Sequence, residues 1–474
     1  MRTLLRKKTE ILKTCTEIKK ALGDDYARLI EKYDIKWNER KQTDRWRKIL
    51  QPPVCAACGR SNARNLVLQA AHITPLAECA VTAEENLLLL CKEIKITDPP
   101  GCHRLFDLGY CSVREMEECR IKWLKGLRPY MRDKMLTLRR EWGPQSSKNA
   151  SYKKALGELR TLQKPLDPQS EDWNVLQIQI SELTRRRARK NILEKAIAEI
   201  ARVDPAKLNK TLRSRYFYEK GYIDLLYGNL DGAFSNFLQG RTALDSDLDS
   251  IKNRWRWAAH TVLLAQVACL KRGLKQSVKW SWRKIRAELQ SALACSESAV
   301  ADAHNIITQS SKKSRELKIE YRDANRWVLN CLTHLVKPDI AEGRFAAAQH
   351  RLEIINAKLQ EMDVSSGWDA TGRWTFLTLK GILGMKRNCR PSIRNDNEAL
   401  AYLSRALVLV LGMRRAQPEG IRDLLISIAE ALELQKDKMA ARFREVGILC
   451  YDFSSWLHPY SFNPVYWKKI ANRS

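Results

Sequence analysis

The stretch from Val54 to Val113 constrains the fold more than any other part of this 474-residue chain. It opens on two cysteines separated by two residues, Cys55 and Cys58, and contains two further cysteines, Cys91 and Cys102. A close cysteine pair followed by two more thiols is typical of a tetrahedral metal site, which fixes distant backbone segments at one point. We therefore expect this stretch to fold so that the four thiols meet.

Charge and cysteine usage bound the class of protein. The chain has 84 Lys and Arg against 54 Asp and Glu, a net charge of +30, which attracts polyanions and nucleic acid first among them. The alternative is a basic protein without a specific partner. The 13 cysteines are an odd number, the N-terminus has no apolar secretory segment, and no apolar run is long enough for a membrane span. We expect a reducing, cytoplasmic setting without membrane contact, where clustered cysteines indicate metal rather than disulfides.

The order of patterns along the chain predicts a mainly α-helical protein with one small mixed module. Residues 1–53 have apolar residues at helical spacing and many Lys and Arg, which predicts a basic helical segment. Residues 54–142 hold the cysteine stretch and a trailing helix. Residues 143–151 begin with Gly-Pro and continue with small and polar residues, which indicates a linker. Residues 152–474 read almost wholly as helices.

Within the mixed module the pattern predicts a strand, a loop, a second strand and a helix. The strands are expected at residues 64–72 and 86–90, and the helix at residues 103–107. A helical pattern then continues from residue 112 to about residue 142.

The helical half contains one segment with a repeat-like pattern, Tyr216 to Gly240, in which aromatic and small residues alternate at helical spacing. Small residues let two helices approach closely while aromatic side chains fill the remaining space. The segment resembles a tetratricopeptide repeat, with weaker echoes at residues 343–352 and 398–406. It departs from that repeat at Asp224, where an aromatic is usual, and no regular period links the copies. We expect a tetratricopeptide-like array of helices.

Basic clusters also occur in the helical half, at residues 185–190, 254–257 and 271–286. The last two interleave Lys and Arg with Trp, a combination that binds phosphates and stacks on bases. The alternative is that the tryptophans pack between helices while the cations face solvent. The same two interpretations apply to the basic residues of the N-terminal segment.

The cysteine pair that opens the stretch needs a second pair to complete a structural zinc site. Cys91 and Cys102 are its natural partners, although residues 92–101 separate them where a tight knuckle would have only two residues. Cys79 and Cys111 are rival ligands, and ordinary buried thiols are the alternative to any metal.

Three further residues occur in a fixed order among these cysteines: His72 in Ala-Ala-His-Ile-Thr-Pro, Asn86 in Glu-Asn-Leu-Leu-Leu-Leu-Cys, and His103 in Cys-His-Arg-Leu-Phe-Asp. With the cysteine framework they resemble the HNH endonuclease family, whose core is a small ββα-metal fold. The resemblance covers about residues 54–113. It implies an enzyme that hydrolyses phosphodiester bonds.

The resemblance also implies a role for each residue. His72 would be the general base that activates a water, for which an imidazole is suited because its pKa lies near neutral pH. Asn86 would orient His72 or brace the loop between the strands. His103 would ligate a catalytic divalent ion, Mg²⁺ or another metal. Asp107 is the second ligand candidate, because i, i+4 spacing on a helix places both side chains on one face.

One position departs from the family pattern. Many members carry an Asp or a His directly before the general base, where it ligates the metal, but this chain has Ala71. Gln69, two residues earlier in the same expected strand, is a poor substitute. The catalytic ion would then be held mainly by His103, Asp107, waters and substrate.

These patterns together favour a metal-dependent HNH endonuclease that acts on DNA, with RNA also open as a substrate. The joining of a nuclease to a helical array resembles bacterial defence and restriction effectors, in which the array or a protein partner controls cutting. The alternative from another class is a non-catalytic, zinc-containing nucleic-acid-binding scaffold or adaptor.

Overall fold

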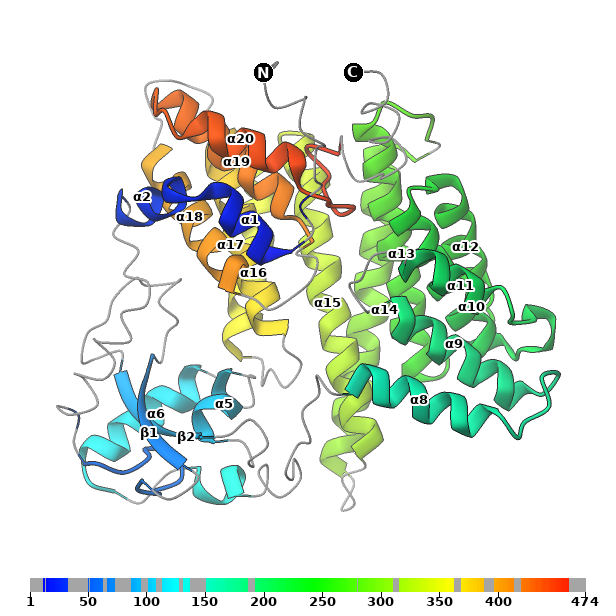
Figure 1. Cartoon of the computed structure of the whole chain (residues 1–474), viewed down its shortest axis with the longest axis horizontal. Helices are drawn as coiled ribbons and strands as arrows, with labels where there is room; N and C mark the ends of the chain where they lie inside the picture. The colour runs from blue at the N-terminus through cyan, green and yellow to red at the C-terminus, as the bar shows by residue number, and fades with distance from the viewer. Residues whose placement is uncertain are drawn as a thin grey trace.

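The computed structural model describes most of the chain and is predominantly helical, with a small two-stranded sheet in the described residues (Figure 1). The described residues are 12, 14–32, 50, 52–62, 66–72, 87–94, 101–107, 113–127, 131–136, 151–185, 192–278, 280–309, 315–361, 368–387, 396–412 and 419–459. No helix within these ranges is long and apolar enough to cross a membrane.

The two expected strands and the helix after them are present, and the expected loop between the strands (residues 73–86) lies outside the described residues. Strands β1 (Leu66–His72) and β2 (Leu87–Glu93) pair antiparallel, and helix α5 (Cys102–Asp107) follows them. The register pairs His72 with Leu87 at one end of the ladder and Leu66 with Glu93 at the other. Helix α6 (Val113–Leu124) completes a unit that lies apart from most of the helices in Figure 1 and is called the cysteine module below.

The core of the cysteine module explains why a short sheet is stable here. Leu87 to Leu90 are consecutive and all buried, so β2 is covered on both faces. Leu105 of α5 and Met116 and Trp123 of α6 belong to the same apolar cluster. The module therefore has a core of its own, to which both the apolar side chains and the four cysteines belong.

The helix expected from residue 112 to about residue 142 is shorter than predicted. Helix α6 ends at Leu124, and Gly126 adopts a φ of +66°, a left-handed conformation that terminates helices. Among the described residues that follow, residues 132–136 are helical. The apolar spacing continues across this break, which is why periodicity alone did not reveal it.

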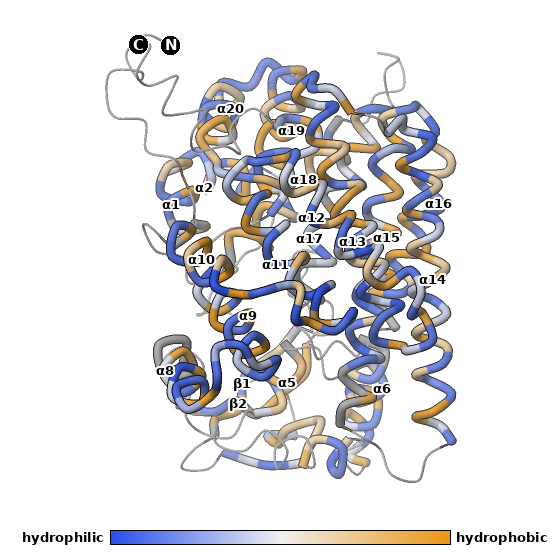
Figure 2. Tube along the Cα trace, turned by 90° about the vertical axis from the view of Figure 1, so that its right-hand side faces the viewer, coloured by the Kyte–Doolittle hydropathy of each residue, from blue (hydrophilic) through white to orange (hydrophobic). Residues whose placement is uncertain are grey.

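Beyond residue 150 the chain forms a series of helices, called the helical array below, in which consecutive helices mostly pack against each other. Its helices are α8 (Ser151–Gln163), α9 (Glu171–Arg185), α10 (Ile192–Ile200), α11 (Lys210–Tyr227), α12 (Leu230–Thr242), α13 (Ile251–Gly273), α14 (Trp282–Gln309), α15 (Arg315–Ala341), α16 (Phe345–Glu361), α17 (Trp368–Arg387), α18 (Asp396–Gly412), α19 (Ile421–Leu434) and α20 (Ala440–Leu449). Figure 2 shows hydrophobic and hydrophilic residues interspersed along them, as amphipathic packing requires.

The repeat-like segment is a helical hairpin with close contacts at its small residues. A Cβ at Gly221 of α11 would lie 2.7 Å from the ring of Phe237 in α12. A Cβ at Gly240 of α12 would lie 2.1 Å from Cε1 of His260 in α13. The small residues thus permit the close approach predicted for them. Asp224, at the position that departs from the repeat, accepts hydrogen bonds from the amides of Asn229 and Asn236 and ties the turn to both helices.

The first helices of the chain pack against its last helices. Helix α1 (Cys15–Leu22) starts with a capping box between Thr14 and Glu17, and α2 (Asp24–Lys32) follows after Gly23. Helix α1 lies against α18 and α20 (Figure 1), and the Leu12 N–H donates to Leu449 O at 3.0 Å. The division of the chain into an N-terminal segment and later domains stays a prediction, but these two helices share the core of the helical array.

Candidate metal centre and flanking catalytic residues

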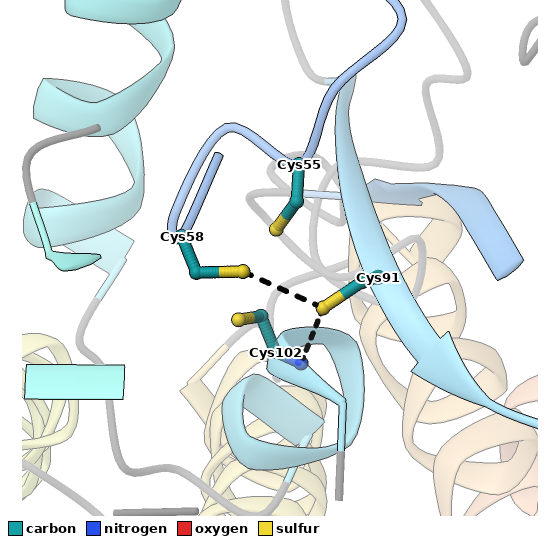
Figure 3. A group of neighbouring side chains, drawn as sticks. All are labelled: Cys55, Cys58, Cys91 and Cys102. Atoms are coloured by element: carbon teal, nitrogen blue, oxygen red, sulfur yellow. Dashed lines mark hydrogen bonds between the residues drawn. The ribbon is translucent and has the colours of Figure 1, made fainter. Parts of the chain in front are cut away.

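Four cysteines of the cysteine module meet at one point (Figure 3). The sulfur atoms of Cys55, Cys58, Cys91 and Cys102 all lie within 4.8 Å of one another, and all four residues are buried. Three backbone elements supply them: the turn after Val54, strand β2, and the first residue of α5. The four-thiol cluster that the spacing predicted is therefore formed.

The first cysteine pair sits on a tight turn. The Gly59 N–H donates to Cys55 O and the Cys55 N–H donates to Arg60 O, each at 2.7 Å. Gly59 has a φ of +73°, which a glycine adopts without strain. The Ala56 N–H also donates to Leu89 O at 2.8 Å, so the turn is hydrogen-bonded directly to β2.

The length of the interval between Cys91 and Cys102 does not separate the two thiols, because the described residues at its two ends lie close together. Gly101 lies so close to β2 that a Cβ there would be 2.3 Å from Cys91 O. The buried carboxylate of Glu93 accepts the Gly101 N–H at 2.8 Å and a guanidinium N–H of Arg104 at 2.9 Å. The Cys102 N–H points at Cys91 Sγ at 3.4 Å. Glu93 thereby fastens the start of α5 to β2.

The cluster fits a tetrahedral metal ion. Zinc–thiolate bonds of about 2.3 Å place the sulfurs of a regular tetrahedron about 3.8 Å apart, and Cys58 Sγ and Cys91 Sγ are 3.7 Å apart. Hydrogen bonding by Cys102 lowers the pKa of Cys58 and Cys91, whereas burial raises the pKa of Cys55. A lowered thiol pKa favours the thiolate, which is the form that ligates zinc.

Other cysteines are not part of this group in the described residues. Cys119 of α6 is buried in the same module but lies outside the cluster, and burial raises its pKa to about 12. Cys79 and Cys111, the rival ligands, lie outside the described residues. The four thiols could therefore bind a structural metal such as zinc.

The backbone of His72 lies in the strand that pairs with β2, the strand that contains Cys91. His72 is the last residue of β1 and pairs with Leu87, the first residue of β2. Asn86 directly precedes Leu87 in the sequence and lies outside the described residues. The side chain of His72 is likewise not described, so its role remains a prediction.

On the helix side of the cluster, His103 follows Cys102 directly and is half-buried in the first turn of α5. Asp107 ends the same helix, one turn after His103, and its side chain lies outside the described part. The helical backbone between them has the i, i+4 spacing on which their joint role was predicted. Their roles as ligands stay a prediction.

The departure from the family pattern has a structural counterpart. Ala71 is 1% exposed and pairs with Leu88, and so an apolar contact stands where many family members have a ligand. Gln69, two residues earlier, is half-buried and pairs with Leu90. The described part of β1 therefore offers no carboxylate or imidazole before His72.

Two residues that the sequence did not single out support the site. Arg120 of α6 donates its Nε–H to Leu87 O at 3.3 Å, at the end of β2 that pairs with His72. Trp123 donates its indole N–H to Pro52 O at 3.2 Å and fixes α6 to the segment before the cysteine turn. Neither residue could be identified from the sequence, because an arginine and a tryptophan in an amphipathic helix form no motif. The same holds for Glu93, which lies in the interval between Cys91 and Cys102 that reads as an insertion.

The tryptophans of the cluster at residues 254–257 favour the packing interpretation. The indole N–H of Trp255 donates to Glu320 at 2.5 Å and that of Trp257 donates to Asp245 at 2.7 Å. Each ring is thereby held to a neighbouring carboxylate within the array. The cluster at residues 185–190 lies mostly outside the described residues.

Comparison with known proteins agrees with this geometry. Residues 55–114 match the family model described as HNH endonuclease, a small part of the chain that contains all four cysteines. Searches of curated proteins and of solved structures found no match. No family match covers the helical array. The matched segment is similar to HNH endonucleases, which indicates a nuclease-like domain and a nucleic-acid substrate in general terms.

Proposed function

We propose that this protein is a metal-dependent endonuclease that hydrolyses phosphodiester bonds of DNA through its cysteine module. The observation that carries the proposal is the four-cysteine cluster inside the segment that matches HNH endonucleases. The cluster joins the turn after Val54, β2 and α5 at one point, and the segments bearing the histidines adjoin these elements. The net charge of +30 suits a polyanionic substrate.

In this proposal each residue of the set has one task. His72 removes a proton from the attacking water, and Asn86 orients the imidazole or braces the loop between the strands. His103 and Asp107 hold the divalent ion, Mg²⁺ or another. The ion, when bound, stabilises negative charge on the phosphate and on the leaving oxygen. A zinc ion held by the four thiols would have no part in the reaction and would hold α5 against β2.

The test uses purified protein and supercoiled plasmid, with Mg²⁺ or Mn²⁺ and with a chelator. We expect metal-dependent nicking or cleavage that falls at least about a hundredfold in His72→Ala, because a general base contributes at least that factor. His350→Ala is the matched control, since His350 is exposed in the helical array and should leave cleavage unchanged. Full activity of His72→Ala would overturn the assignment of the base. A parallel RNA substrate distinguishes the two nucleic acids.

A second candidate is a zinc-containing scaffold that binds nucleic acid without cutting it. The apolar pairing of Ala71 with Leu88 favours it, because it removes a common metal-ligand position. This candidate gives salt-sensitive DNA binding that His72→Ala does not change, with no cleavage under any metal. The plasmid assay and a binding assay on the same samples separate the two candidates.

We further propose that the helical array, a tetratricopeptide-like domain, controls the nuclease through a protein partner, as an effector in a cytoplasmic bacterial defence or restriction system. The close packing at Gly221 and Gly240 supports a repeat-like array, and α6 of the cysteine module packs against α16. A contact of this kind gives the array a physical means of affecting the module. A pull-down with the full chain as bait tests for the partner, and recovery of no specific protein counts against this role.

A further inference from the structure

A cavity of about 450 Å³ lies in the helical array, where α13 ends and α14 begins. Its lining includes Arg272 and Lys275 from the end of α13, Trp282 from the start of α14, and Trp456 from the segment after α20. That segment is packed tightly in place, since a Cβ at Gly273 would lie 2.8 Å from the ring of Pro459. Cavities of roughly 300–1,000 Å³ are the size of small-molecule sites.

The lining of this cavity is cationic. Arg272 and Lys275 are its charged residues, and it contains no carboxylate. A second cavity, of about 370 Å³, provides the contrast: Asp249 and Asp302 line it, and its Arg254 is paired with Asp302 at 2.5 Å. The first cavity therefore favours an anion, and the second does not.

The Arg272 guanidinium at the first cavity is incompletely hydrogen-bonded within the described residues. Arg272 donates from Nη1 to Trp280 O at 3.2 Å, while its buried Nε finds no acceptor in that part of the chain. A buried guanidinium N–H without an acceptor is costly, and an anion in the cavity would supply one.

Aromatic rings lie beside these cations. The Arg272 guanidinium lies 5.0 Å from the ring centroid of Trp282. Trp456 is 8% exposed, and its backbone N–H donates to the buried Asp423 carboxylate at 2.9 Å. The same carboxylate accepts the Ser455 hydroxyl at 2.6 Å, so the segment bearing Trp456 is held rigidly. Indole rings are stacking surfaces for nucleobases, and guanidinium and ammonium groups bind phosphate.

We propose that this cavity binds a nucleotide, with its phosphate on Arg272 and Lys275 and its base against Trp282 or Trp456. The base-plus-phosphate chemistry is shared by a free mononucleotide and by the end of a single strand. The site is separate from the cysteine module and serves recognition, not hydrolysis.

The test is calorimetric titration of the full-length protein with adenosine 5′-monophosphate, with adenosine and with inorganic phosphate. We expect saturable binding of the nucleotide, at least tenfold tighter than either part alone, because base and phosphate bind together. Tryptophan fluorescence should change during the same titration. A 5′-phosphorylated octanucleotide that displaces the mononucleotide assigns the site to strand ends, and failure to displace it assigns the site to free nucleotides.

Variants place the binding in this cavity. Lys275→Gln and Arg272→Gln should each weaken nucleotide binding at least tenfold, and Arg272→Lys should restore part of it. Lys436→Gln is a matched control: both lysines are exposed, directly follow the C-cap residue of a helix and have nearly the same left-handed φ, +56° for Lys275 and +55° for Lys436. Absence of saturable binding by the wild-type protein, or equal binding by the wild type and both glutamine variants, would overturn the proposal. Neither result depends on DNA cleavage.

Discussion

Cys91 contacts two of the other cysteines of the metal centre. It lies 3.7 Å from Cys58 Sγ and 3.4 Å from the Cys102 N–H, and so its sulfur links the cysteine turn to α5. We predict that Cys91→Ser abolishes zinc binding and lowers the unfolding temperature of the cysteine module. The effect should be large, because structural zinc in small domains contributes about 10–16 kcal/mol of binding free energy. Metal analysis of the purified variant and thermal denaturation measure it.

Cys119 supplies the control for that variant. It is buried in the same module, in α6, but lies outside the four-thiol cluster. Cys119→Ser should keep a full complement of zinc, with only the loss of stability expected for a polar group in a core. Normal zinc content in Cys91→Ser would contradict the assignment of the four ligands.

Gly101 is required where α5 meets β2. A side chain there would meet backbone atoms, with Cys91 O at 2.3 Å and Lys92 Cα at 2.5 Å, and backbone cannot move aside as a flexible side chain can. We predict that Gly101→Ala destabilises the module by about 1–3 kcal/mol or more, as overpacking does. Gly157→Ala in α8 is the matched control, since its Cβ would meet no atom within 4 Å and alanine favours a helix by about 1 kcal/mol. Chemical denaturation compares the two, and equal stability of both variants would refute the close contact.

His260 of α13 contacts two neighbouring helices, α11 and α12. The ring in α13 shares a hydrogen bond of 2.8 Å with the Ser214 hydroxyl of α11 and fills the space left by Gly240 of α12. Burial lowers the pKa of His260 to about 3, so the folded protein binds the proton less readily than the unfolded chain does. The stability from the neutral ring is complete above pH 6.5 and is lost as the pH falls toward 3.

In His260→Gln, the free energy of unfolding should therefore fall less steeply between pH 6 and pH 4 than in the wild type. If unfolding takes up one proton fewer, the slope of the free energy of unfolding against pH decreases by about 1.4 kcal/mol per pH unit. Burial also lowers the pKa of His334 and His458, so some acid lability remains in the variant. Denaturant unfolding at several pH values gives the slopes. His350→Gln, with a side chain 74% exposed, should keep the wild-type slope, and an unchanged slope in His260→Gln would disprove the linkage.

The elements were predictable where local pattern decides them. Strand β1 and the leucines of β2 lie in short, mostly apolar runs, and the start of α5 follows from i, i+4 spacing. The break at Gly126 was not predicted, because apolar spacing continues through it and one glycine in a helical pattern is often tolerated. The clamp of Glu93 on Gly101 and Arg104 could not be predicted, because its members lie on either side of a segment without a periodic pattern.

At the scale of the whole molecule, the ends of the described chain meet. The Cys15 thiol donates to Val410 O at 3.2 Å, and Lys32 forms an ion pair with Asp437 at 2.7 Å. No short-range pattern encodes contacts across some four hundred residues, and so residues 1–53 read as a segment of their own. Complementary apolar faces supply the physical reason for the contact: Ile18 and Leu22 are almost fully buried in the core of the helical array.

Because α1 packs against the last helices, we predict that a core substitution in α1 lowers the stability of the helical array. Leu22 is 2% exposed, and Leu22→Ala should destabilise the main helical unfolding transition by about 2–5 kcal/mol, the cost of a cavity in a core. Zinc content should stay unchanged, because the cysteine module has a separate apolar cluster. Leu162→Ala is the control, since Leu162 is 61% exposed in α8 and should change stability by less than about 0.5 kcal/mol. Circular dichroism during urea unfolding measures both variants. If they unfold alike, the N-terminal helices do not contribute to the core of the array, and the first 53 residues act as an independent segment.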